Sequence, residues 1–155
     1  MSTETNTGTN PRTSTETSTE TSTEANKEVA RRLYEELITL RRPELLEEII
    51  AEDAVDETVP PGAGPGGRED FREHIQGVWQ TVENVKATVT DLVAEGDRVV
   101  VFWRIEGVHR APLFGAPASG RHFIGNSISR ITFRDGKIVR YNVLPDRLGI
   151  LQQIS

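Results

Sequence analysis

Apolar residues change their spacing once along this chain, near Glu83, and this change limits what the chain can fold into. Before Glu83 they recur every three or four residues, as in the set Val29, Leu33 and Leu37, which is typical of one buried helical face. After Glu83 they alternate with polar residues, and glycine or Asp-Gly pairs separate extended segments. Helices followed by strands favour the α+β class, in which helices cover one face of an antiparallel sheet.

The same spacing predicts where the elements lie. Three helices are expected first, from Asn26, from Pro43 to about Ala51, and over residues 71–82. A short extended piece and a Pro- and Gly-rich run at residues 60–67 precede the third helix. Four strands follow, and the glycine turns between them predict an antiparallel meander with a short C-terminal helix after it. The expected strands cover residues 85–93, 98–109, 122–133 and 137–144.

The first 24 residues differ from the rest of the chain. They are almost entirely Thr, Ser, Glu and Asn, and residues 13–24 repeat Thr-Ser-Thr-Glu three times. Such a segment cannot offset its ordering entropy by burying apolar surface. We therefore expect a disordered tail over residues 1–24 and one folded domain over residues 25–155.

Composition argues against several classes of function. A net charge of −6 without a basic run argues against nucleic-acid binding, and the chain has no cysteine for a thiolate site. Its three histidines are scattered, and the glycine pattern at residues 62–67 follows prolines rather than a strand, so we expect no metal and no cofactor. No apolar run reaches about 18 residues and no secretory signal is visible, which predicts no membrane association and a cytoplasmic location.

Polar side chains among apolar ones on the predicted strands suggest a small-molecule pocket. Trp103 and His109 share one strand face, Asn126 lies on the next strand and Asn142 on the last. The two asparagines are equally explained as hydrogen-bonded structural amides. Asp146, at the end of the last strand, has two interpretations that the residues leave open. It either caps the C-terminal helix or serves as a general base whose pKa is raised by burial.

Several motifs occur in a recognisable order: Gly66-Gly67-Arg68-Glu69-Asp70-Phe71, Gly107-Val108-His109, Arg134-Asp135-Gly136-Lys137 and Pro145-Asp146-Arg147-Leu148-Gly149. In this arrangement the chain resembles the SnoaL-like polyketide cyclases of the nuclear-transport-factor-2-like superfamily. The resemblance implies a cone-shaped α+β barrel, in which three N-terminal helices and a curved antiparallel sheet enclose an apolar pocket.

The resemblance also implies a chemistry. Asp146 would be the general base and His109 would hold or polarise the substrate, in a cofactor-independent intramolecular aldol ring closure of an apolar polyketide intermediate. A homodimer is expected by the same resemblance. The residues expected to contact substrate are Trp103, Asn126, Asn142, Phe71 and Trp79.

The chain departs from the family pattern at two positions. Glu57 stands where many members carry histidine, and Asn142 where many carry tryptophan. If Glu57 faces the pocket, it could share the site with Asp146 and favour epoxide opening or a hydroxylation-type reaction; otherwise it is a solvated rim residue. A non-catalytic binding or dimerisation module is the further alternative. We expect Arg104 and Arg130 to form outer salt bridges and His74 to lie at the surface.

Overall fold

The computed structural model describes residues 11–155, with side chains from Ser22 onward. Helix α1 (Pro11–Arg32) continues into η1 (Leu33–Ile38), a π-helical stretch in which the Thr39 amide donates to the Tyr34 carbonyl oxygen at 3.1 Å. Helix α2 (Leu45–Ile49) is short, α3 (Arg68–Thr81) is long, and α4 (Arg147–Ile154) ends the chain. The predicted second helix is therefore shorter than expected, because Ile50 and Ala51 already belong to a strand.

Five strands form one sheet in the order β1-β5-β4-β3-β2. Strands β2 (Val82–Glu95), β3 (Arg98–His109), β4 (His122–Arg134) and β5 (Lys137–Pro145) form the predicted antiparallel meander. The short extended piece expected before the Pro- and Gly-rich run is a fifth strand of this sheet, β1 (Ile50–Asp56), which pairs with β5 in parallel and places Asp56 beside Tyr141. This pairing joins segments far apart in the chain, and no local pattern predicts it.

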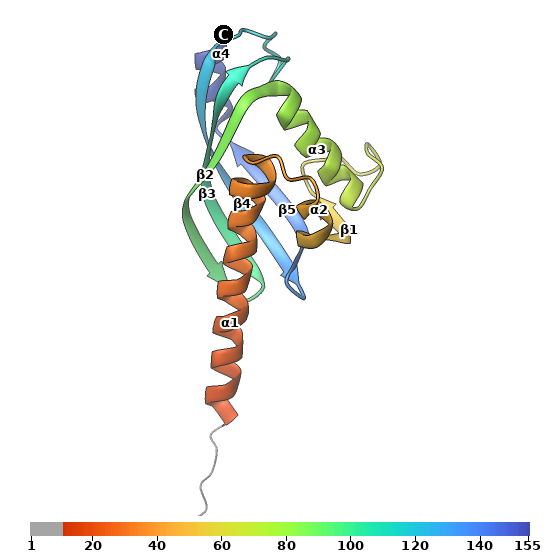
Figure 1. Ribbon diagram of the computed structural model, residues 1–155, viewed down its shortest axis with the longest axis vertical. Helices are drawn as coiled ribbons and strands as arrows, with labels where there is room; N and C mark the ends of the chain where they lie inside the picture. The colour runs from red at the N-terminus through yellow and green to blue at the C-terminus, as the bar shows by residue number, and fades with distance from the viewer. Residues whose placement is uncertain (1–10) are drawn as a thin grey trace, which may run out of the picture.

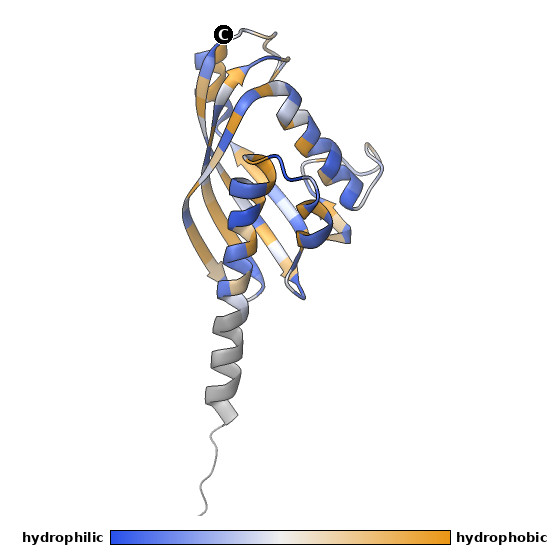
Figure 2. Ribbon diagram, viewed as in Figure 1, coloured by the Kyte–Doolittle hydropathy of each residue, from blue (hydrophilic) through white to orange (hydrophobic). Residues whose placement is uncertain are grey.

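The sheet is curved, and α1, α2 and α3 lie against the same side of it (Figure 1). This inner side carries the core, whose largest side chains include Tyr34, Phe123, Ile131 and Ile138. The helices turn hydrophilic residues away from the sheet (Figure 2), as amphipathic helices covering one face do. The α+β class and the cone-like arrangement are thus confirmed, although the helical part contains η1 as well as the three expected helices.

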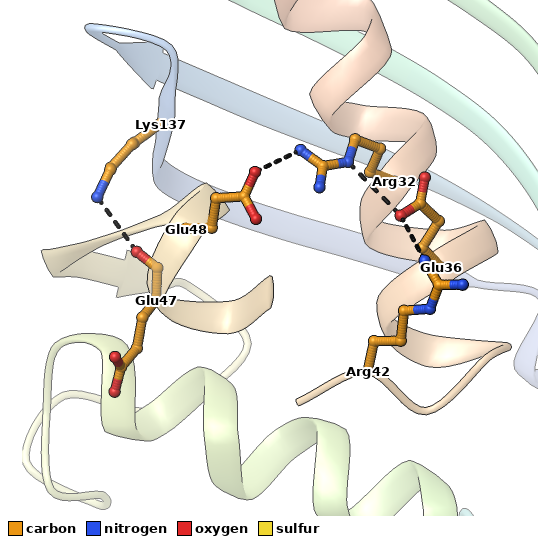
Figure 3. A network of polar contacts seen from close by, with 6 residues as sticks. All are labelled: Arg32, Glu36, Arg42, Glu47, Glu48 and Lys137. Carbon is orange, nitrogen blue, oxygen red and sulfur yellow. Dashed lines mark hydrogen bonds and ion pairs between the residues drawn. The ribbon is translucent and has the colours of Figure 1, made fainter. Parts of the chain in front are cut away.

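Surface ion pairs and one hydrogen bond connect α1, α2 and the start of β5. Arg32 in α1 donates to Glu48 at 2.9 Å and lies 3.6 Å from Glu36, while the Lys137 ammonium donates to the Glu47 carbonyl oxygen at 3.1 Å (Figure 3). The hydrogen bond from Arg32 lowers the pKa of Glu48. Exposed pairs of this kind add little stability individually, but here they link α1, α2 and the start of β5.

Residues 11–24, expected to belong to a disordered tail, form the first part of α1 in the structure. Extending a helix that is already nucleated adds one backbone hydrogen bond for each residue, which favours continuation from the packed part. Among the described side chains, Asn26 is the first that is buried. The expectation for residues 1–10 lies outside the described residues, and a domain beginning at residue 25 stays a prediction.

Within residues 11–155, each helix is too short or too polar to cross a membrane.

Candidate active site

A cavity of about 430 Å³ lies between α3, the inner side of the sheet, the 110–121 loop and the start of α4. Most of its lining is apolar, and a smaller hollow of about 40 Å³ shares five of its lining residues. The apolar lining comprises Val78, Val82, Trp103, Ile105, Leu113, Phe114, Phe123, Val143, Pro145 and Ile150, with Tyr141 among them. An apolar hollow with few polar groups is the usual form of a small-molecule site.

Small residues keep this space open. Ser127 lines the cavity from β4, where a bulkier inward side chain would fill it. Gly77 lines it from the interior of α3, and a methyl group placed there would meet no atom within 4 Å. Glycine inside a helix costs about 1 kcal/mol relative to alanine. The helix therefore carries a residue that is unfavourable for stability at a position facing the cavity.

The main polar feature of the cavity wall is a pair formed by His74 and Asp56. His74 lines the cavity from α3, and its Nδ1 lies 2.7 Å from Oδ2 of Asp56 at the end of β1. The Asp56 side chain is fully buried, whereas that of His74 is 32% exposed. The Tyr141 ring stands edge-on to the imidazole, with 6.1 Å between ring centroids. The histidine is thereby held on two sides and open toward the cavity.

Asp56 is an ionised carboxylate in this arrangement. Burial alone would raise its pKa, but hydrogen bonds from His74 and from the hydroxyl and amide of Thr58 hold that pKa below its ordinary value. A carboxylate can only accept, so Nδ1 of His74 carries the hydrogen and donates it. In the neutral imidazole the lone pair is then on Nε2, which is the nitrogen free to exchange a proton.

Hydrogen bonds fix the aromatic floor of the cavity. The Trp103 indole donates to Oγ of Ser129 at 2.9 Å, and Ser129 lies 3.4 Å from the Tyr141 hydroxyl. The Tyr34 ring packs on Trp103 at 4.5 Å between centroids. Burial raises the pKa of the Tyr141 hydroxyl, so this group stays protonated at neutral pH.

Arg147 is the cationic side chain of the cavity lining. Its guanidinium lies over the Phe114 ring, 5.0 Å from the centroid, which is a cation–π distance. Among the side chains that the structure describes, none forms a hydrogen bond or an ion pair with it.

The three aromatic residues expected to contact substrate lie in three different surroundings. Trp103 lines the main cavity, as predicted, and Phe71 borders the smaller hollow beside it. Trp79 lines neither, because its indole donates to the Ile38 carbonyl oxygen at 2.9 Å and the Arg41 guanidinium lies 5.7 Å from the centre of its ring. Trp79 thus lies outside both hollows, and the contact with substrate expected of it stays a prediction.

Asn126 and Asn142, expected to contact substrate, do not line the cavity, and neither does Glu57, for which the sequence left a position at the rim open. Trp103 pairs with Ser127 across β3 and β4, so the residues that alternate with Ser127 face outward, Asn126 included. On that outer face Glu57 binds Arg130 at 2.7 Å and Arg140 at 2.9 Å. The interpretation in which Glu57 faces the pocket is therefore not supported, and the predicted ion pair of Arg130 is confirmed.

No ion pair of Arg104 is found among the described residues, so that part of the expectation is wrong.

Asp146 is exposed and caps α4, accepting a hydrogen bond from the Gly149 amide at 3.0 Å. It is not a lining residue of the cavity, although its neighbours Pro145 and Arg147 are. Of the two interpretations left open by the sequence, the structure has the geometry of the cap. Asp146 and Glu57 share no cavity among the described residues.

His109 is fully buried but does not line the cavity either. Its Nδ1 lies 2.9 Å from the Ser119 hydroxyl and accepts from the Ser119 amide at 3.2 Å. These contacts close the loop between β3 and β4. The geometry thus gives His109 a role in loop structure, its buried Nε2 has no hydrogen-bond partner among the described residues, and the contact with substrate expected of His109 stays a prediction.

His74, expected to lie at the surface, is 32% exposed but also lines the cavity, and the sequence held a signal for this second position. His74 falls on the same helical face as Phe71, Ile75 and Val78, which the spacing already marked as buried. The burial of Asp56 depends on the parallel pairing of β1, which only the structure reveals.

Residues 11–155 bring no three potential metal-ligating side chains together. The expectation of a metal-free site stays a prediction.

The fold is thus a curved α+β cone around a largely apolar cavity, with the hydrogen-bonded His74–Asp56 pair on its wall. Residues 28–154 match the family model of the SnoaL-like polyketide cyclases, and the chain belongs to that family. None of the curated proteins compared with the chain matches it.

Solved structures share this fold. TsrD from Streptomyces laurentii is 27% identical, with a TM-score of 0.73 over 87% of this chain and 96% of that one. IdmH from Streptomyces antibioticus, a proposed polyketide cyclase, is 30% identical, with a TM-score of 0.70 over 83% and 96%. AclR from Streptomyces galilaeus, a proposed hydroxylase, has a TM-score of 0.69 over 85% and 82%, and at 15% identity it shows the fold alone.

Proposed function

We propose that this protein is a polyketide cyclase or related tailoring enzyme, and that His74 exchanges the proton during ring closure of an apolar intermediate. The observation that carries the proposal is the His74–Asp56 pair on the wall of a largely apolar cavity. Family membership and the likeness to IdmH support the substrate class. The pair replaces the base that the resemblance suggested, because Asp146 is exposed and bound to its own helix.

The reaction needs a proton to leave an acidified carbon. His74 Nε2 takes that proton, while Asp56 keeps Nδ1 protonated and favours the imidazolium that forms. The resulting carbanion attacks a carbonyl carbon of the same molecule, forming the new carbon–carbon bond. The alkoxide produced takes a proton back, so the addition itself loses no atoms. The apolar walls contribute by holding the two carbons together in the folded chain of the substrate.

Asp56 is a positioning residue in this proposal. Its carboxylate is buried behind the imidazole and contacts Thr58 and His74 rather than lining the cavity. Replacing it with asparagine allows the amide group to donate toward Nδ1 and favours the wrong tautomer, a change that is costly in other carboxylate–histidine pairs.

Proton exchange at carbon tests the proposal without the natural substrate. The apolar bicyclic ketone 2-tetralone is incubated with the protein in D₂O, and the loss of its C1 proton signal is followed by NMR. We expect the wild-type protein to accelerate the exchange, and His74→Gln to lower the rate by about 100-fold or more. Asp56→Asn should lower kcat more than KM, since it alters the base and not the apolar walls.

His122→Gln is the matched control, because His122 is exposed at the start of β4 and is not a lining residue of the cavity. It should exchange at the wild-type rate. If His74→Gln retained that rate while remaining folded by circular dichroism, His74 would be excluded as the base. Coexpression with a synthase of aromatic polyketides, followed by chromatography and mass spectrometry, then tests ring closure itself.

A further inference from the structure

We propose that Arg147 forms an anion subsite at one end of the cavity, so that the substrate is an apolar ring system carrying an anionic oxygen, a carboxylate or an enolate. This inference rests on the proposed function, because it names the substrate class of the same cavity. It starts from a cation that lines a largely apolar hollow and has no carboxylate partner among the described side chains. Arginine recognises carboxylate oxygens through paired N–H donors.

Arg147 is held in place without using its hydrogen-bond donors. The guanidinium lies over the Phe114 ring, and the residue belongs to α4, whose Ile150 packs against Gly125 of β4. Stacking uses the face of the guanidinium and leaves its N–H groups free in the plane. Arg147 is itself exposed, as Arg130 and Arg134 are, but those two arginines are paired with carboxylates.

Strand β5 separates the subsite from the acid–base pair. His74 stands beside Tyr141, while Arg147 follows Pro145, and both Tyr141 and Pro145 line the cavity. From Tyr141 to Pro145 the extended strand advances four residues, which corresponds to a backbone separation of about 13 Å. A ligand can therefore contact both groups only if it extends along the strand, as a fused-ring molecule does.

The two ends of the cavity differ in charge. The lining at the His74 end includes Glu73, and Asp56 lies behind the imidazole, whereas Arg147 marks the other end. A negative charge on the ligand is repelled at the first end and attracted at the second. An anionic substrate should therefore enter with its charged oxygen toward Arg147 and its acidic carbon toward His74.

Two fluorescent probes that differ in one group test this. The apolar anion 1-anilinonaphthalene-8-sulfonate is compared with N-phenyl-1-naphthylamine, which has the same rings without the sulfonate. We expect Arg147→Gln to weaken binding of the anion by about tenfold or more and leave the neutral probe unchanged. Arg147→Lys should retain part of the preference. Arg98→Gln removes an equal charge from an exposed position outside the cavity and should change neither affinity.

Cavity occupancy is checked with Gly77→Phe, which places a ring in the hollow and should weaken both probes. If both probes bind in the cavity but Arg147→Gln affects them equally, the anion subsite is excluded and the proposed function stands. If neither probe binds the wild-type protein, the cavity is not a site for apolar ligands, and both the proposed function and the anion subsite are contradicted. If the anion depends on Arg147 but His74→Gln leaves proton exchange unchanged, the subsite stands and the acid–base role fails.

Discussion

At the scale of single residues, substitutions of Asp146 distinguish a helix-capping role from a catalytic role. As an N-cap it should contribute about 1 kcal/mol, so Asp146→Ala should lower the free energy of unfolding by that amount. Asparagine caps helices nearly as well, so Asp146→Asn should be close to neutral. Urea denaturation measures both variants, and both should catalyse exchange of 2-tetralone at the wild-type rate. If Asp146→Asn lost as much of the exchange rate as His74→Gln, Asp146 rather than His74 would be identified as the general base.

Ser129 is a second residue whose change has a defined result. Its hydroxyl is buried and accepts the hydrogen bond of the Trp103 indole. Ser129→Ala leaves that N–H without a partner, and an unsatisfied buried donor costs about 1–3 kcal/mol. Chemical denaturation should show this loss, and Trp103 fluorescence should shift as the indole rearranges. Ser155→Ala is a suitable comparison because that serine is exposed and forms hydrogen bonds only through its backbone. Equal stability of Ser129→Ala and the wild type would contradict the assigned bond.

At the scale of elements, helix α3 should be stabilised by removing its internal glycine. Gly77→Ala adds a methyl group that meets no atom within 4 Å, and the gain in helix propensity is about 1 kcal/mol. Thermal unfolding should therefore move to higher temperature. The methyl group also enters the cavity, so the affinity for N-phenyl-1-naphthylamine should fall or remain equal, never rise. A destabilised Gly77→Ala would mean that the helix is more closely packed there than described.

The contact between β1 and α3 predicts how stability depends on pH. Hydrogen bonds from His74 and Thr58 outweigh burial and hold the pKa of Asp56 below its ordinary value of 3.8. A group with a depressed pKa in the folded state contributes stability above its unfolded pKa, and that stability is lost as the pH falls through the folded pKa. The wild type should therefore lose more unfolding free energy between about pH 5 and pH 3 than Asp56→Asn does. Parallel pH dependences would show that Asp56 is not ionised in the fold.

The strands can be predicted from the sequence, but the faces that they turn toward the cavity cannot. Spacing alone predicted the strands from β2 to β5 and their turns, because alternation and Asp-Gly pairs are local signals. Alternation does not tell which face of β4 and β5 points toward the cavity. The polar residues Asn126 and Asn142, expected at the cavity, face outward, whereas Ser127 and Tyr141 line it. Register across strands decides this, and a single sequence does not contain it.

At the scale of the whole molecule, the domain boundary can be tested by truncation. The described side chains are not buried until Asn26, so a chain starting at Ala25 should keep the cavity and its unfolding free energy within about 0.5 kcal/mol. Proton exchange of 2-tetralone should also be unchanged. Loss of either property would show that residues 1–24 belong to the domain. The homodimer expected from the family resemblance stays a prediction, which light scattering of the full chain tests.

The parallel pairing of β1 with β5 has a consequence for biosynthesis. Asp56 and His74 are synthesised early, yet the Tyr141 ring beside that imidazole belongs to one of the last strands to be made. Contacts between such distant segments form slowly, because the intervening chain must be ordered first. On the ribosome, the nascent chain can build its helices and first hairpins before this wall of the cavity is complete. The imidazole of His74 and the ring of Tyr141 should therefore meet only after β5 has been made and has paired with β1.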